Sequence, residues 1–72
     1  MRLTMRPIYE LPWVRRERAD SHFRKALAEI QALIAEDPAW TRQYETLAYG
    51  IEAAISLLDL IEDVESQRAG AA

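Results

Sequence analysis

The sequence predicts an all-α protein, an antiparallel hairpin of two amphipathic helices preceded by an extended N-terminal arm. Apolar residues recur at intervals of three and four along two long segments, which is the period of a helix with one buried face. Asp37 and Pro38 separate the two segments. Hydrophobic residues make up 50% of the chain and only two residues are glycine, which favours helix over sheet. A chain of 72 residues has room for a single domain.

The N-terminal arm covers residues 1–12. Pro7 and Pro12 restrict the residues before them to extended backbone. The arm also carries apolar residues such as Leu3 and Ile8, which are unusual in a purely solvated tail. Two alternatives therefore stay open: a frayed terminus, which is common at chain ends, or an arm that docks on the hairpin or on a partner.

The first helix is expected over residues 13–36, since Pro12 suits the first position of a helix. Proline disfavours helical backbone in the residue before it, so Pro38 should end this helix near Glu36. The positions expected to face the core are Phe23, Ala26, Ile30 and Leu33, widened by Leu27 and Ile34.

The second helix is expected over residues 38–67. Pro38 fits its first position, and the Asp37 carboxylate should cap its free N–H groups. Residues 68–72 lack an apolar stripe, and Gly70 can end a helix, so they are expected to form a disordered tail. The expected core positions are Trp40, Tyr44, Leu47, Ile51, Ala54, Leu58 and Ile61, extended by Ala48 and Ile55.

A second apolar row follows Gly50 on the same helix and consists of Leu57, Leu60 and Val64. One neighbouring helix can cover only one row. The second row is therefore expected to meet a second copy, which gives an antiparallel four-helix homodimer, or to meet a target protein. A single hairpin with this row exposed, or covered by the arm, is the remaining alternative.

Charge is distributed unevenly along the chain. Residues 1–25 contain seven basic and three acidic residues, and residues 26–72 contain two basic and nine acidic residues, which gives the net charge of −3. An antiparallel hairpin places these parts side by side, so internal ion pairs are expected. If both helices rise by the same amount per residue from the bend, Arg15, Arg16 and Arg18 lie opposite Asp59, Glu62 and Asp63.

Few residues of this chain suit catalysis or metal binding. The absence of cysteine and the single His22 exclude a disulfide, a thiolate zinc site and a histidine-rich site. Asp20, Ser21 and His22 are adjacent, and adjacent helical residues point about 100° apart, so they cannot form a catalytic triad. The two glycines lie twenty residues apart and make no phosphate loop. We therefore expect no catalytic, cofactor or metal site.

The function expected from this pattern is a small protein–protein interaction module of phage or bacterial type, a cytoplasmic inhibitor or regulator that binds a larger protein. No apolar run approaches the roughly 18 residues that a membrane span needs. The candidate interface consists of Trp13, Tyr49, Leu57, Leu60 and Val64.

The alternative function is that of a dimeric helical nucleic-acid-binding protein. Its phosphate contacts would come from a basic strip near the N-terminus. The isoelectric point of about 5.0 lies below the basic range typical of such domains. The strip consists of Arg15, Arg16, Arg18, Arg24 and Lys25.

Overall fold

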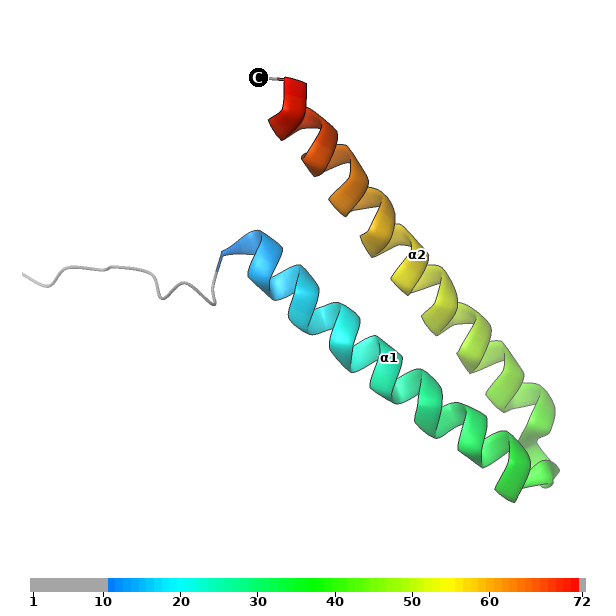
Figure 1. Ribbon diagram of the computed structural model, residues 1–72. Helices are drawn as coiled ribbons and strands as arrows, with labels where there is room; N and C mark the ends of the chain where they lie inside the picture. The colour runs from blue at the N-terminus through cyan, green and yellow to red at the C-terminus, as the bar shows by residue number, and fades with distance from the viewer. Residues whose placement is uncertain (1–10, 72) are drawn as a thin grey trace, which may run out of the picture.

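The structure, a computed structural model, describes residues 11–71. It contains two long helices, α1 (Pro12–Glu36) and α2 (Thr41–Ala71), joined by a single turn of 3-10 helix, η2 (Pro38–Trp40). The helices α1 and α2 pack against each other and run in opposite directions (Figure 1). No strand occurs in the described part of the chain. The predicted all-helical hairpin is therefore confirmed.

Helix α1 begins at Pro12, one residue before the predicted start. The residue before it, Leu11, is extended, with φ −65° and ψ 145°. Its carbonyl accepts the first helical hydrogen bond, from the Arg15 N–H at 2.9 Å. The rest of the predicted arm, residues 1–10, lies outside the described residues.

The bend follows from Pro38, as predicted, and α1 ends at Glu36. Asp37 has left the helical conformation, with φ −134° and ψ 72°. The prediction that its carboxylate caps the next helix is wrong, because the side chain makes no capping hydrogen bond. The first turn is a 3-10 turn in which the Asp37 carbonyl accepts the Trp40 N–H at 3.3 Å. The carboxylate instead accepts a hydrogen bond from the Tyr44 hydroxyl at 2.8 Å.

This hydrogen bond ties the bend to the second turn of α2. The bond to Asp37, desolvation and the charge of Asp37 raise the pKa of the Tyr44 phenol above its ordinary value of 10.0. The neutral phenol therefore stabilises the folded state fully below about pH 10, and this contribution is lost as pH rises through the raised pKa.

We expect Tyr44→Phe to lower the midpoint of thermal unfolding at neutral pH, because the ring remains while the donor is lost. The difference from the unsubstituted protein should shrink as pH rises through the raised pKa of the phenol, where the hydroxyl loses the proton that it donates. Circular-dichroism melts of both proteins over a series of pH values from neutral to alkaline measure this. A difference in midpoint that stays constant over the whole series would contradict the hydrogen bond.

The contact between α1 and α2 is narrower than the sequence predicts. Ile55 is the only buried hydrophobic residue of the described part, with 8% of its surface exposed. Its neighbours in the contact are half-buried and recur mainly at intervals of four and three along each helix. These neighbours are Phe23, Leu27, Ile30 and Ile34 on α1, and Tyr44, Ala48, Ile51, Ala54 and Leu58 on α2.

Five positions expected in the core are exposed. Each apolar stripe is broad, and one neighbouring helix covers only part of such a stripe. Tyr44, which is hydrogen-bonded to the bend, and Ile55 lie on the side of α2 that faces α1, and the other edge of the stripe remains outside. The exposed positions are Ala26, Leu33, Trp40, Leu47 and Ile61.

Helix α2 continues to Ala71, four residues beyond the predicted end at Gln67. Gly70 was expected to end the helix, but neither glycine of the described part has a positive φ, so Gly70 does not make the left-handed turn that stops a helix. The predicted disordered tail is thus helical as far as Ala71. Within the described residues, no helix is both long enough and apolar enough to span a membrane.

Candidate protein-binding surface

An exposed apolar surface lies on the side of α2 that faces away from α1. Its large members are Leu57, Leu60 and Val64, whose exposed fractions are 58%, 56% and 48%. Gly50 and Ala53 continue the row toward the N-terminus at the same spacing of three and four, and both are exposed. We call these five residues the outer row.

The outer row lies on the side of α2 away from the residues that contact α1. At 100° per residue, its mean direction lies roughly 140° around α2 from that of the half-buried positions. Helix α1 therefore cannot cover any of the outer row.

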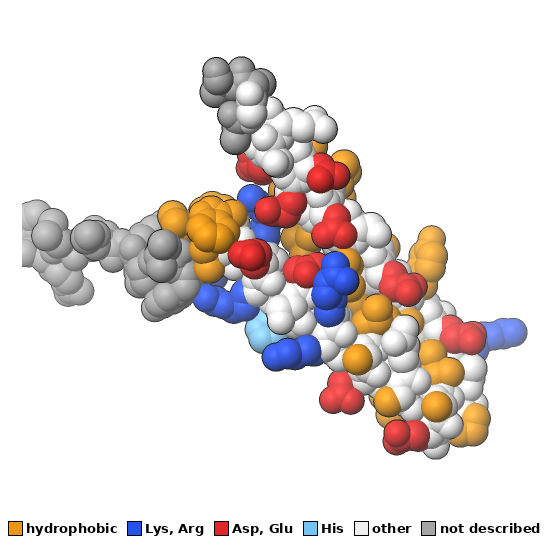
Figure 2. Space-filling model, in the orientation of Figure 1, with side chains coloured by type: hydrophobic (Ala, Val, Ile, Leu, Met, Phe, Trp, Pro, Cys, Tyr) orange, Lys and Arg blue, Asp and Glu red, His pale blue; other side chains and the backbone are white. Residues whose placement is uncertain are grey.

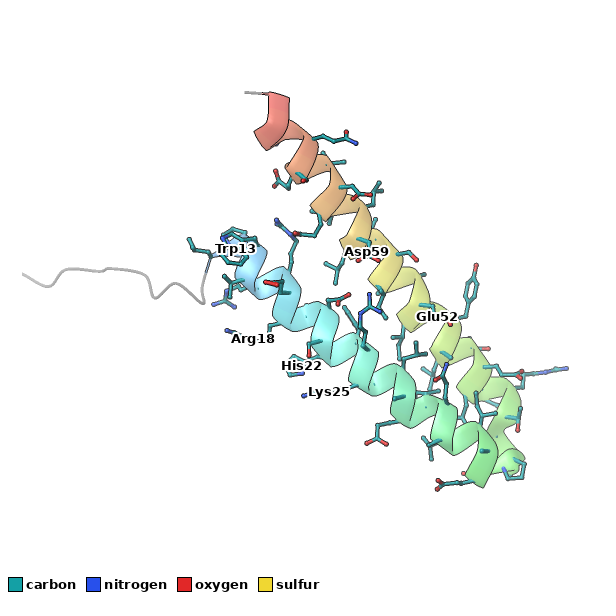
Figure 3. The ribbon with its side chains drawn as sticks, viewed as in Figure 1. Trp13, Arg18, His22, Lys25, Glu52 and Asp59 are labelled. Carbon is teal, nitrogen blue, oxygen red and sulfur yellow. The ribbon has the colours of Figure 1, made fainter. Side chains whose placement is uncertain are left out.

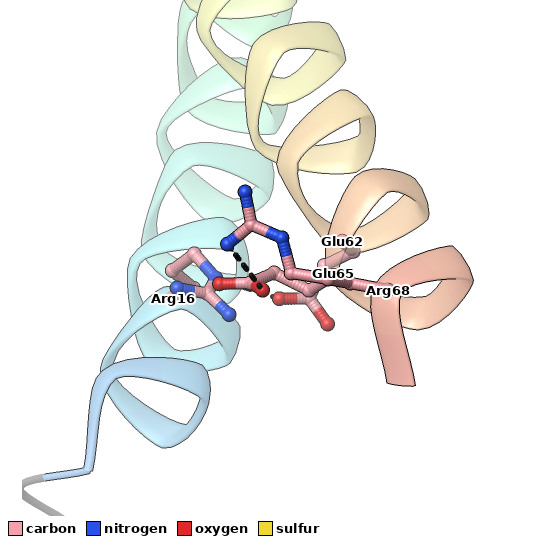
Figure 4. A network of polar contacts seen from close by, with 4 residues as sticks. All are labelled: Arg16, Glu62, Glu65 and Arg68. Atoms are coloured by element: carbon pink, nitrogen blue, oxygen red, sulfur yellow. Dashed lines mark hydrogen bonds and ion pairs between the residues drawn. The ribbon is translucent and has the colours of Figure 1, made fainter. Parts of the chain in front are cut away.

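A shallow hollow occupies the C-terminal end of the outer row. Leu60, Ile61 and Val64 form its apolar part, and Glu65 and Arg68 form its charged rim. The rim residues approach each other, with Arg68 Nη1 3.9 Å from Glu65 Oε2 (Figure 4). An apolar centre with a polar rim is the usual composition of a protein–protein interface.

The structure places the other two predicted interface residues differently. Tyr49 is 75% exposed and lies at the edge of the outer row, four residues before Ala53. Trp13 is half-exposed in the first turn of α1, away from this row (Figure 3). The structure thus groups Leu57, Leu60 and Val64, with Tyr49 at their edge, and separates Trp13.

A second exposed apolar line was missed because its members were assigned to the core. Trp40, Leu47 and Ile61 are all exposed. They lie at multiples of seven residues along the chain, and seven residues are close to two helical turns, so they share one side of η2 and α2. The signal in the sequence was the width of the apolar stripe, which exceeds what a single helix covers.

The basic residues do not form one surface. Figure 2 shows acidic side chains along α2 and basic side chains gathered over the N-terminal half of α1. Arg16 points toward α2, and its Nε lies 2.6 Å from Glu62 Oε2 (Figure 4), as the predicted pairing requires. Arg24 Nε lies 2.8 Å from Asp20 Oδ2, and its Nη2 lies 3.9 Å from Asp59 Oδ2.

The residues of the predicted nucleic-acid strip therefore lie in different surroundings. The hydrogen bond and charge of Asp20 raise the pKa of the Arg24 guanidinium above its ordinary value. Arg18 and Lys25 lie with His22 on the side of α1 turned away from α2 (Figure 3). Arg15 is also exposed. Arg16 and Arg24 are engaged by acids, which weakens the case for phosphate binding.

We expect Arg16→Glu to destabilise the open end of the hairpin, because it places two acids side by side. A partly exposed pair contributes about 0.2–1 kcal/mol, and replacing attraction by repulsion roughly doubles the effect. The double variant Arg16→Glu, Glu62→Arg should regain most of the loss. Urea unfolding at low salt measures all three proteins, and a double variant no more stable than the single one would contradict a direct pair.

The groove between the helices at this end is lined by Leu58 and by charged residues. Asp20 Oδ1 is buried there without a hydrogen-bond partner. The described residues contain no group of three His, Cys, Asp or Glu side chains placed to hold a metal ion. The charged residues that line the groove are Arg16, Glu17, Asp20, Asp59 and Glu62.

Comparisons with known proteins gave no match. No model of a protein family matches the chain, and neither the curated proteins nor the solved structures contain a significant match. The function must therefore be argued from the geometry of the chain itself.

Proposed function

We propose that this chain is a small, non-enzymatic, cytoplasmic interaction module that assembles as an antiparallel four-helix homodimer and binds a larger protein as an inhibitor or regulator. The outer row of α2 carries the contacts that hold the dimer together, and binding of the larger protein depends on that dimer. One observation supports the proposal above all others: Ile55 is the only buried hydrophobic residue of the described part, whereas ten large hydrophobic residues are exposed.

The energetics of small domains explain why this observation matters. A domain of about 60 residues buries only about 60% of the surface of its unfolded chain and is marginally stable. Chains of this size usually gain support from disulfides, metals or partner subunits. This chain has no cysteine. A protein partner is the support that remains, and the outer row is the surface that it would cover.

A pull-down from lysate of the source cells tests the proposal. The bait is compared with Leu57→Ala, Leu60→Ala, and with a matched double variant on the polar side of α2, Glu45→Ala, Glu52→Ala. Alanine is a strong helix former and both leucines are exposed, so the hairpin should keep its helicity. A stoichiometric protein should survive nuclease treatment, be lost with the leucine variant and be kept with the glutamate variant.

Two results would overturn the proposal. Equal capture by the leucine variant and the unsubstituted chain would remove the outer row from the interface. Capture that disappears with nuclease, or that falls steeply between low and moderate salt, would instead support the nucleic-acid alternative, because phosphate binding depends strongly on salt.

A further inference from the structure

We infer that a second copy of this chain covers the outer row, with the two α2 helices antiparallel and in a register where residue k of one copy meets residue 110 − k of the other. This inference rests on the proposed function and names the partner of that surface. Its first ground is spacing. The outer row repeats at intervals of three and four, which is the pattern by which two helices interlock their side chains along a common seam.

The second ground is complementary size along the row. The N-terminal half consists of Gly50 and Ala53, and the C-terminal half of Leu57, Leu60 and Val64. In this register Leu60 meets Gly50 of the second copy, and Leu57 meets Ala53. Nothing lies within 4 Å of the position where a Cβ on Gly50 would be, so the surface there is open to a large side chain.

A parallel pair would not have this complementarity. It would place Gly50 against Gly50 and Leu60 against Leu60, which leaves a gap at one end and crowds the other. Interiors pack at crystal-like density, and both gaps and overpacking are destabilising. Large residues opposite small ones keep the two helices at one separation along the whole seam.

The third ground is charge. Residues 59–65 contain four acids, Asp59, Glu62, Asp63 and Glu65. The antiparallel register places this segment beside residues 45–51 of the second copy, whose only acid is Glu45. Asp59 and Glu62 face α1, where Arg24 and Arg16 approach them, so Asp63 and Glu65 are the two acids nearer the seam. A parallel pair would align Asp63 and Glu65 of one copy with the same residues of the other, and like charges repel. Antiparallel helix dipoles also favour this arrangement.

The same register accounts for the second exposed line. Leu47 and Ile61 lie on one side of α2, next to the outer row, and both are exposed. Positions flanking an antiparallel seam meet their counterparts across the two-fold axis, and here Leu47 comes beside Ile61 of the second copy. A single arrangement thus covers the outer row and two members of the line that α1 leaves uncovered, Leu47 and Ile61.

Cysteine crosslinking tests the register, since the natural chain has no cysteine. Gly50→Cys and Leu60→Cys are purified separately, mixed in equal amounts and oxidised. We expect a disulfide between the two variants, because positions 50 and 60 face each other. Neither variant alone should link to itself, since ten residues along the helix separate like positions by about 15 Å, and a disulfide joins Cα atoms only about 4.4–6.8 Å apart.

Glu52→Cys, on the polar side of α2, is the matched control and should not link to any of these variants. Linking of each single variant to itself would show a parallel pair and overturn the register. No linking in any mixture, together with a solution mass of 8.3 kDa, would overturn self-association altogether. That result would also remove the homodimer from the proposed function. The binding of a larger protein would remain if the pull-down still showed capture that depends on Leu57 and Leu60.

Gly50→Leu gives a second readout that separates the hairpin from the dimer. In an isolated hairpin this change should raise helicity, because leucine is a better helix former than glycine and the space is open. In the dimer the new side chain collides with Leu60 of the second copy, so the dimer dissociation constant should rise at least tenfold. Unchanged or tighter association would contradict the close approach at Gly50.

Discussion

Leu57→Asp is expected to convert the homodimer into monomers while leaving the helices formed. In the proposed antiparallel pair, Leu57 of each copy would pack against Ala53 of the other, so the substitution would bury two unpaired carboxylates per dimer. Burying a charge without a partner costs several kcal/mol after relaxation. A loss of about 4 kcal/mol per dimer corresponds to a dissociation constant about a thousandfold higher.

Sedimentation equilibrium measures this change, with circular dichroism to confirm that the helices persist. Ala28→Asp is the matched control, because it adds the same charge at an exposed position of α1, away from α2. The control should associate like the unsubstituted chain. Equal association of Leu57→Asp and Ala28→Asp would remove Leu57 from the contact.

Ile55→Ala is expected to unfold the hairpin. Ile55 is the only buried residue of the contact between α1 and α2, and truncating a buried isoleucine to alanine costs about 2–5 kcal/mol. A core of this size rarely supplies more than about 3–5 kcal/mol in total. The variant should therefore lose most of its helical signal at 25 °C.

Urea titrations followed by circular dichroism measure this loss. Ile55→Val is the graded control, since removing one methylene costs about 0.5–1.5 kcal/mol and should leave a folded protein with a lower midpoint. A helical signal and midpoint unchanged in Ile55→Ala would show that the hairpin does not depend on this contact.

The hairpin itself could be predicted because its causes are local. Pro38 fixes the end of α1, and the intervals of three and four predict two amphipathic helices. The rotation of each helix about its axis could not be predicted in the same way. Both stripes are wide enough to offer several seams. The contacts that accompany the observed seam, Tyr44 with Asp37 across the bend and Arg16 with Glu62 between the helices, could not be read from the apolar pattern.

The candidate surface could be predicted only in part, because the apolar pattern does not determine the rotation of α2 about its axis. Leu57, Leu60 and Val64 stood apart from the first apolar row in the sequence, and the structure groups them. Leu47 and Ile61 were missed, because a residue at seven-residue spacing is equally suited to a core and to its exposed flank. Trp13 was included for its residue type alone, which does not determine the face of α1 on which it lies.

The mass of the chain in solution, followed over protein concentration together with its thermal midpoint, tests the central claim most directly. A homodimer held by the outer row should reach twice the chain mass of 8.3 kDa, and its midpoint should rise with concentration, since association stabilises the folded state by mass action. A mass of 8.3 kDa with a midpoint independent of concentration would contradict the account.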